Sequence, residues 1–151
     1  MFASPPLSGR RNPTTKATGK DANPRPSAVS FCMPKVTLSE KFAQFTEHWS
    51  PKIVGEVNDS YVKLVKFQGE FVWHHHQHED ELFLVVEGGF TMRLRVGDVE
   101  LKAGDFYIVP RGVEHCPVAR EEAHVLLLEP KTTLNTGNVQ NERTVPVLDR
   151  L

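Results

Sequence analysis

Residues 69–88 read GEFVWHHHQHEDELFLVVEG, and they place four histidines within five residues directly before an apolar run. In an extended strand, residues two apart point to the same face, so His74 and His76 share a face while His75 points away. Glu81 opens the apolar run after a short turn, which allows its carboxylate to fold back beside the two imidazoles. Two imidazoles and a carboxylate suit one divalent transition metal, such as Zn, Fe, Mn, Ni or Cu.

A histidine cluster can also be an affinity tag or a solvated polar turn. A tag is excluded because the cluster is internal and interrupted by Gln77. A polar turn does not explain why a carboxylate and a strongly apolar run follow at once. Two shifted registers stay open. Pairing His75 with Gln77 loses one imidazole, and pairing His76 with His78 leaves only two residues before Glu81.

The chain around this cluster alternates between apolar and polar residues with a period of two, which is typical of half-buried strands. The clearest case is residues 91–96, where Met92, Leu94 and Val96 are expected on the buried face. The strands are predicted at residues 52–57, 60–67, 70–76, 82–87, 90–96, 98–101, 106–109, 115–119 and 124–129. Nine short strands without helical interludes predict an all-β sandwich or barrel.

A short helix is predicted before the strands. Thr37-Leu38-Ser39-Glu40 fits a capping box, and Leu38, Phe42 and Phe45 fall on one helical face. The helix is expected to end before Ser50-Pro51, because the residue before a proline is biased out of the helical region. Its apolar face is expected to form a lid or a dimer contact.

The chain has 151 residues, which is enough for one ordinary domain. Residues 1–32 hold five prolines and five basic residues against one acidic residue, with almost no periodic apolar residues. We expect this segment to be a disordered or non-native extension, either a transit peptide or sequence upstream of a true start at Met33. A barrel is expected over residues 35–130, followed by a surface tail over 131–151.

Composition limits the classes of function. The formal net charge is −1 and the residues after 32 are acidic overall, which excludes a basic patch for nucleic acid. No apolar stretch is long enough to cross a bilayer, so no membrane partner is expected. Cys32 and Cys116 are too few for a disulfide scaffold and favour a cytoplasmic protein. Cys116 is expected to be a buried, unreactive thiol.

Two motifs in the chain resemble those of the cupin family. The characteristic residues of the first motif occur in order as Gly69, His74, His76, Glu81 and Gly88. The second motif is similar to GDFYIVPRGVEH at residues 104–115, with its glycine, Pro-x-Gly and histidine in register. The resemblance implies a jelly-roll barrel with one metal in its mouth. It adds His115 as the fourth metal ligand beside His74, His76 and Glu81.

Two positions depart from the family pattern. Four residues separate Gly69 from His74, where the family usually has five, which is a small change within a turn. Ala119 stands where the second motif has an asparagine, so a residue that supports the site in the family is absent here.

The resemblance implies a small metal-dependent enzyme of isomerase or lyase type, acting on a polar small molecule such as a sugar or an oxo-acid. The alternatives are a metal-dependent dioxygenase and a non-catalytic binding or sensing module. Tyr107, Glu114 and His78 are the candidates for acid–base groups. A cavity with several polar groups would favour an enzyme, and an apolar or closed one a structural or sensing role. The resemblance also implies a homodimer paired through barrel edge strands.

Overall fold

The structure is a computed structural model that describes residues 35–151. These residues form an all-β fold with one short helix, α1, at Leu38–Phe42. The strands are β1 Lys52–Val57, β2 Ser60–Glu70, β3 Glu81–Glu87, β4 Gly89–Leu94, β5 Val99–Lys102, β6 Phe106–Val109 and β7 His115–Pro130. The predicted fold class is confirmed, whereas the predictions for residues 1–32, including Cys32, and for the start at Met33 lie outside the described residues.

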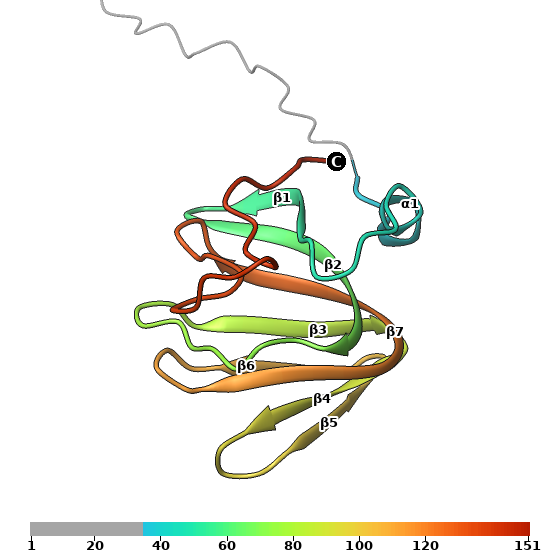
Figure 1. Ribbon diagram of the computed structural model, residues 1–151. Helices are drawn as coiled ribbons and strands as arrows, with labels where there is room; N and C mark the ends of the chain where they lie inside the picture. The colour runs from blue at the N-terminus through green and yellow to red at the C-terminus, as the bar shows by residue number, and fades with distance from the viewer. Residues whose placement is uncertain (1–34) are drawn as a thin grey trace, which may run out of the picture. The chain divides into compact units, whose positions relative to one another are not determined.

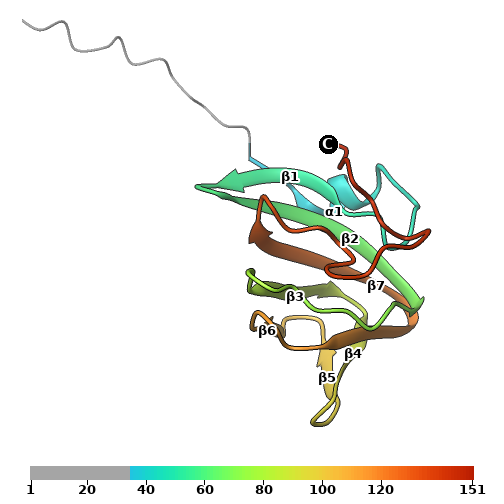
Figure 2. The same ribbon diagram turned by 60° about the vertical axis from the view of Figure 1, so that its left-hand side comes forward.

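The strands form one curled antiparallel sheet. Its main path is β1-β2-β7-β3-β6, and β4 pairs with both β7 and β5. The long strand β7 connects the two parts, because residues 115–118 pair with β4 while residues 124–128 lie between β2 and β3. Strand β1 and the β4–β5 hairpin lie at opposite ends of the curl (Figure 1 and Figure 2).

The two faces of this sheet carry separate apolar clusters. Alternate residues of β2, β3, β4 and β7 point inward and fill the barrel, with Phe67, Phe83 and Phe90 among the core aromatics. On the outer face, Phe42 and Phe45 pack on Leu64 of β2. The helix-side apolar residues therefore pack on the outer face of the sheet, where a lid or a dimer contact was expected.

The helix is shorter than predicted. It ends at Phe42, and the Thr37 side chain makes no capping hydrogen bond. The chain leaves the helix because Trp49 docks onto β2, where its backbone N–H donates to the Lys66 carbonyl at 2.9 Å. Trp49 adopts a φ of 59°, a left-handed conformation that a continuing right-handed helix does not contain.

Seven strands replace the nine predicted. Residues 71–76 are extended but form no ladder, because Phe71 N–H donates to the Pro117 carbonyl and proline has no N–H to return the bond. The runs 115–119 and 124–129 are one continuous strand, since the charged residues between them bend without breaking it. Strand β4 ends at Leu94, so Val96 lies in a turn with 94% exposure and not on the buried face.

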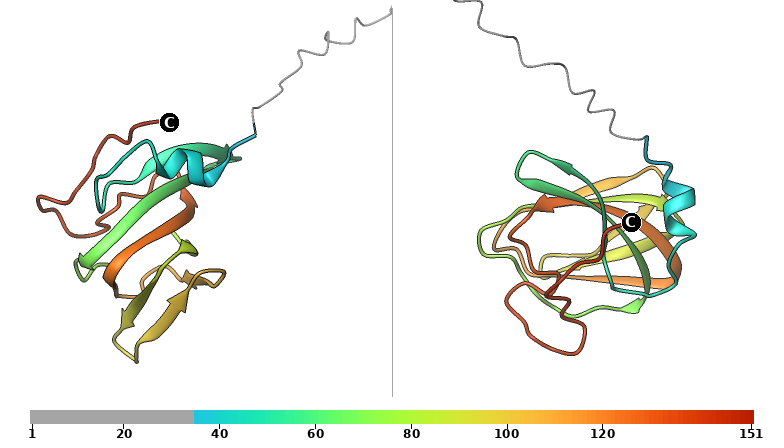
Figure 3. Two further views of the ribbon diagram at one scale, coloured as in Figure 1. Left: turned by 90° about the vertical axis from the view of Figure 1, so that its right-hand side faces the viewer. Right: turned by 90° about the horizontal axis from the view of Figure 1, so that it is seen from above.

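The C-terminal segment packs back against the barrel, where a surface tail was expected. Ile53 of β1 exchanges backbone hydrogen bonds with Asp149 and Leu151. Figure 3 shows this last segment, in red, running back over the end of the barrel that carries β1. Thr136 is completely buried. This packing brings residues 131–151 close to the histidine cluster.

Candidate metal centre

Four side chains from two distant parts of the chain meet at one end of the barrel. His74 and His76 come from the extended segment before β3, Glu81 is the first residue of β3, and His115 is the first residue of β7. All four are buried, with exposures of 5% or less. One potential ligand atom from each lies within 4.8 Å of all the others.

Backbone hydrogen bonds fasten the two motifs to each other. His74 and His115 exchange a pair of N–H to carbonyl bonds, of 3.1 and 2.9 Å. Gly112 N–H donates to the His76 carbonyl at 2.7 Å. The Asp80 carboxylate accepts the Arg111 N–H at 2.9 Å. These bonds hold the four side chains together without any direct tie between the imidazoles.

The imidazole orientations leave the inner nitrogens free. Nδ1 of His74 bonds to the Val72 carbonyl and Nδ1 of His115 to the Val113 carbonyl, both at 2.9 Å. A carbonyl accepts only from N–H, so in these neutral rings Nε2 carries the lone pair. Proteins usually orient a metal-ligating histidine in this way, with a hydrogen bond from the ring nitrogen that does not bind the metal.

The inner atoms are unsatisfied by the protein itself. Nε2 of His76 lies 3.1 Å and Nε2 of His115 3.5 Å from Oε2 of Glu81. These three buried atoms make no hydrogen bond. Buried polar atoms are nearly always partnered, so three converging orphans fit a bound cation. Nitrogen and carboxylate donors match the divalent transition metals.

The electrostatics of the cluster favour ligand-competent protonation states. Burial, aided by the nearby His115, lowers the pKa of His74 to about 4. Burial alone would raise the pKa of Glu81, but the imidazoles of His115 and His76 outweigh it and hold that pKa below its usual range. At neutral pH the site therefore offers a neutral imidazole at His74 and an anionic carboxylate at Glu81, the forms that bind a metal.

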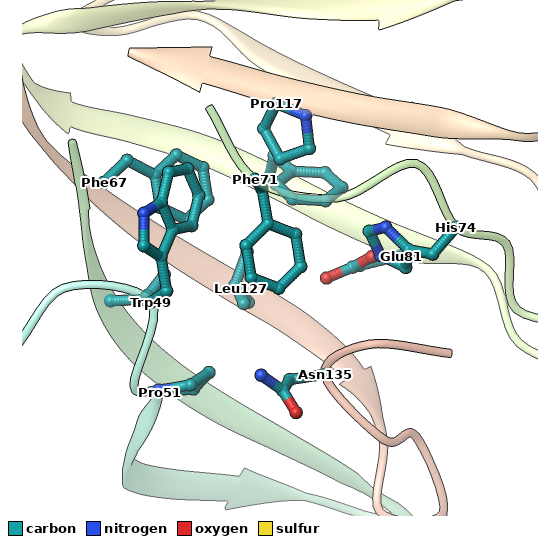
Figure 4. Close-up of a pocket in the computed structure, with 11 residues that line it drawn as sticks. Trp49, Pro51, Phe67, Phe71, His74, Glu81, Pro117, Leu127 and Asn135 are labelled. Carbon is teal, nitrogen blue, oxygen red and sulfur yellow. The ribbon is translucent and has the colours of Figure 1, made fainter. Parts of the chain in front are cut away.

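A small cavity reaches the cluster from inside the barrel. His74 and Glu81 lie on one side of it and Trp49 stands on the other, as Figure 4 shows. Its volume is about 30 Å³, which is room for about two water molecules. The remaining lining is apolar or amide: Pro51, Val65, Phe67, Phe71, Phe83, Pro117, Leu127 and Asn135.

Asn135 is the one lining residue with a polar side chain outside the cluster. Its Nδ2 donates to the Arg143 carbonyl at 2.8 Å and its Oδ1 accepts the Val145 N–H at 2.9 Å. Both ends of the amide are thus used to fold the C-terminal segment. The cavity has a polar metal-facing side and an otherwise apolar wall.

The weaker candidates from sequence do not line this cavity. Tyr107 is half-buried against the barrel core, opposite Phe83. Glu114 is exposed and bonds to Arg95 at 2.9 Å, which lowers its pKa. His78 lies in an exposed turn.

The structure also shows where the residues of the two shifted registers lie, and where Ala119, which replaces the asparagine of the second motif, lies. His75 lies outside the cluster and its backbone N–H bonds to the Asn138 side chain at 2.9 Å. Neither shifted set, with His75 or with His78, is therefore brought together. Ala119 is fully buried in the apolar core. Cys116 is also buried, as expected, and burial together with Glu70 raises its pKa to about 11.

Sequence reasoning missed three residues near the cluster. Trp49 lines the cavity from a segment predicted as helix. Lys63 and Glu129 form an ion pair of 2.6 Å inside the barrel, with side-chain exposures of 1% and 0%. The signal for this pair was present, because Lys63 has the strand phase of Val65 and Phe67, and charged residues in a buried phase need a partner.

A curled antiparallel barrel with three histidines and a glutamate at its mouth is typical of a class of metal-binding barrels. The sequence model of the cupin domain matches residues 61–129. A cupin-2 domain protein from Shewanella frigidimarina, known from its crystal structure, is 45% identical; the match covers 64% of this chain and 94% of that one, with a TM-score of 0.63. This chain belongs to the cupin family, and the resemblance seen in its motifs is confirmed.

Two other proteins are similar to this chain. A crystal structure of a protein from Neisseria meningitidis is 26% identical and covers 65% of this chain and all of its own, with a TM-score of 0.60. An uncharacterised protein of Bacillus subtilis is 39% identical over 79 residues, or 52% of this chain. The match spans 64% of that relative's length.

Proposed function

We propose that the protein binds one divalent transition metal through His74, His76, Glu81 and His115. The support is the convergence of unpartnered buried Nε2 and Oε2 atoms from opposite motifs. When bound, such a metal supplies Lewis acidity and, if it is redox-active, dioxygen chemistry. The barrel residues hold the imidazoles of His74 and His115 in one tautomer, keep the carboxylate ionised and limit access of water.

The function that the site supports best is a metal-dependent dioxygenase acting on a small, largely apolar molecule. The observation that carries this proposal is the cavity wall, which is aromatic or aliphatic beyond the cluster except for the Asn135 amide. Such a wall was expected of a structural or sensing role, but it also suits this enzyme, because a redox-active metal would supply the dioxygen chemistry without acid–base groups from the wall. An isomerase or lyase acting on a sugar or oxo-acid requires lining groups that bind hydroxyls and move protons. Among residues 35–151, none of the candidates Tyr107, Glu114 and His78 lines the cavity. On this side of the cluster that first expectation therefore has less support, whereas on the other side His76 borders a second cavity lined by polar residues such as Gln77 and Glu79.

A non-catalytic binding or sensing module is the second candidate. The small volume of the cavity favours it, because a substrate larger than a few atoms needs the wall to move. In this case the protein would hold its metal tightly and signal through a change in packing around the cavity.

Oxygen uptake separates the two functions. Protein loaded in turn with Fe²⁺, Mn²⁺, Ni²⁺ or Cu²⁺ would be mixed with small phenols and enols, and uptake recorded with an oxygen electrode. Substrate-dependent uptake that is lost in His76→Ala supports the dioxygenase. Tight metal binding without uptake for any pairing supports the binding module. Turnover of a sugar phosphate or oxo-acid without uptake would restore the isomerase or lyase.

We also propose that the protein is a homodimer. Two rows of apolar residues cross the outer face of the sheet in register, Val62-Leu128-Leu82-Ile108 and Leu64-Leu126-Leu84-Phe106. At the edge strand β6, Phe106 is 63% and Ile108 47% exposed. An apolar face that ends at an unpaired edge suits a second copy of the chain.

No helix within residues 35–151 is long and apolar enough to span a membrane. A location in the cytoplasm belongs to the proposal as well, with the buried free thiol of Cys116 as its support.

A further inference from the structure

The buried ion pair inside the barrel is the feature that the proposed metal site leaves unexplained. Nζ of Lys63 donates to Oε1 of Glu129 at 2.6 Å. Among residues 35–151, Lys63 is one of the largest side chains that are fully buried. Its aliphatic stem replaces the apolar residue that the alternation of β2 would otherwise place there.

Such a pair is costly to keep. Two charges lose their hydration on burial, and well-packed apolar residues of similar volume often stabilise a fold equally well or better. The pairing here is also incomplete, because Oε2 of Glu129 is buried without a hydrogen-bond partner. A role beyond stability would account for the pair.

The position of Glu129 indicates that role. Leu82 of β3 pairs with Leu128 of β7, so Glu81 and Glu129 follow one step further along the same antiparallel ladder. Both side chains point into the barrel, where Glu81 faces the histidines. Residues directly opposite each other in an antiparallel pair have Cβ atoms about 4.5–5.5 Å apart, so the two carboxyl groups are neighbours. Burial and then the Glu81 carboxylate raise the pKa of Glu129.

We propose that Lys63 and Glu129 are positioning residues for the metal ligand Glu81. Lys63 fixes the Glu129 carboxyl from β2, and Glu129 lies against the Glu81 carboxyl from β7. That contact keeps Oε2 of Glu81 directed at His76 and His115. The inference rests on the proposed metal site and assigns to it a supporting layer that the motifs do not contain.

The Lys63–Glu129 pair also supplies a contact that supports the metal ligands and that Ala119 cannot make. The second cupin motif has an asparagine at that position, and here it holds a buried methyl group. Residues that orient metal ligands typically affect metal affinity by about 10-fold to 100-fold. The same range is expected for the loss of Glu129 if it orients Glu81.

The test is a titration of the metal-free full chain with Co²⁺, following the absorption spectrum of the bound ion against a competing chelator. Glu129→Leu should weaken Co²⁺ binding by about 10-fold to 100-fold and change the spectrum. Glu129→Gln keeps an oxygen for Lys63 and offers N–H to Glu81, so it should bind within about threefold of the unmodified chain. Glu114→Leu, which removes a surface ion pair, is the matched control and should bind normally.

A second variant separates positioning from folding. Glu129→Leu leaves Lys63 buried and unpaired, which can unfold the chain. Lys63→Met/Glu129→Leu removes both charges and should melt near the unmodified chain while still binding Co²⁺ weakly with a changed spectrum. Unchanged affinity and spectrum in this double variant would overturn the inference and leave the metal site standing. Failure of the unmodified chain to bind Co²⁺ would overturn both.

Discussion

Nε2 of His76 lies 3.1 Å from Oε2 of Glu81, and neither atom makes a hydrogen bond inside the protein. The segment that carries His76 is anchored by backbone bonds to the loop before His115 and by the Asn138 contact at His75. The choice of metal ligands can therefore be tested, because the side chains of the neighbouring residues His75 and His76 point in different directions.

His76→Ala should abolish metal binding, since it removes one of the converging nitrogens. Metal content of untagged protein, measured by plasma mass spectrometry, should fall from about one ion per chain to nearly none. His75→Ala is the matched control and should retain its metal, because the His75 side chain lies outside the cluster. Equal loss in both variants would show that the register is wrong.

The metal-free protein should lose stability as the pH falls from 6.5 towards 4. The unfolded chain binds a proton at His74 near pH 6.5, while burial and His115 keep the folded-state pKa at about 4. Protons therefore favour the unfolded chain through this window, by up to about 3 kcal/mol. Melting temperature measured against pH would show the decline, and His74→Gln should flatten it. A profile that is the same in both proteins would contradict the assignment.

Trp49→Ala should destabilise the fold by about 3–5 kcal/mol, because it opens a cavity between Phe67 and Phe71, which stack on Trp49. The φ of 59° does not reduce this loss, because alanine also carries a Cβ and keeps the same backbone strain. Added indole should raise the melting temperature of the variant by filling the space. Trp73→Ala is the control: Trp73 is half-buried outside this cavity, so indole should leave its melting temperature unchanged.

Gly137→Ala should loosen the C-terminal segment. A Cβ at this position would lie 2.3 Å from the His75 carbonyl oxygen, and the residue has a φ of 52°. We expect a loss of about 2–3 kcal/mol and faster amide exchange at Asn138. Gly69→Ala has a similar positive φ but open space around it, so it should cost only about 1 kcal/mol. Equal losses would mean that the close approach to His75 is unimportant.

Phe106→Asp should shift the protein from dimer to monomer, because it places a charge in the apolar row at strand β6. Sedimentation velocity would measure the change. Val96→Asp alters a more exposed valine in the β4–β5 turn and should leave the dimer intact. A monomeric unmodified chain would refute the dimer directly.

The sequence by itself determined the fold class and drew attention to the histidine cluster. Alternation of apolar residues is a local property that follows from strand geometry, so it is readable without contacts. The spacing of His74, His76 and Glu81 was equally local, because all three residues lie in the short segment 74–81 that leads into β3. Strand limits were less readable: the effect of Pro117 on residues 71–76 depends on which segment lies opposite it.

Only the tertiary structure decided what surrounds the cluster. Lys63 and Glu129 are 66 residues apart. Trp49 precedes the strands of the barrel in the sequence and Asn135 follows them, yet both line the same cavity. Their meeting depends on how β7 distributes its pairing between β2, β3 and β4. Long-range register of this kind is set by packing of the whole sheet, and no local pattern carries it.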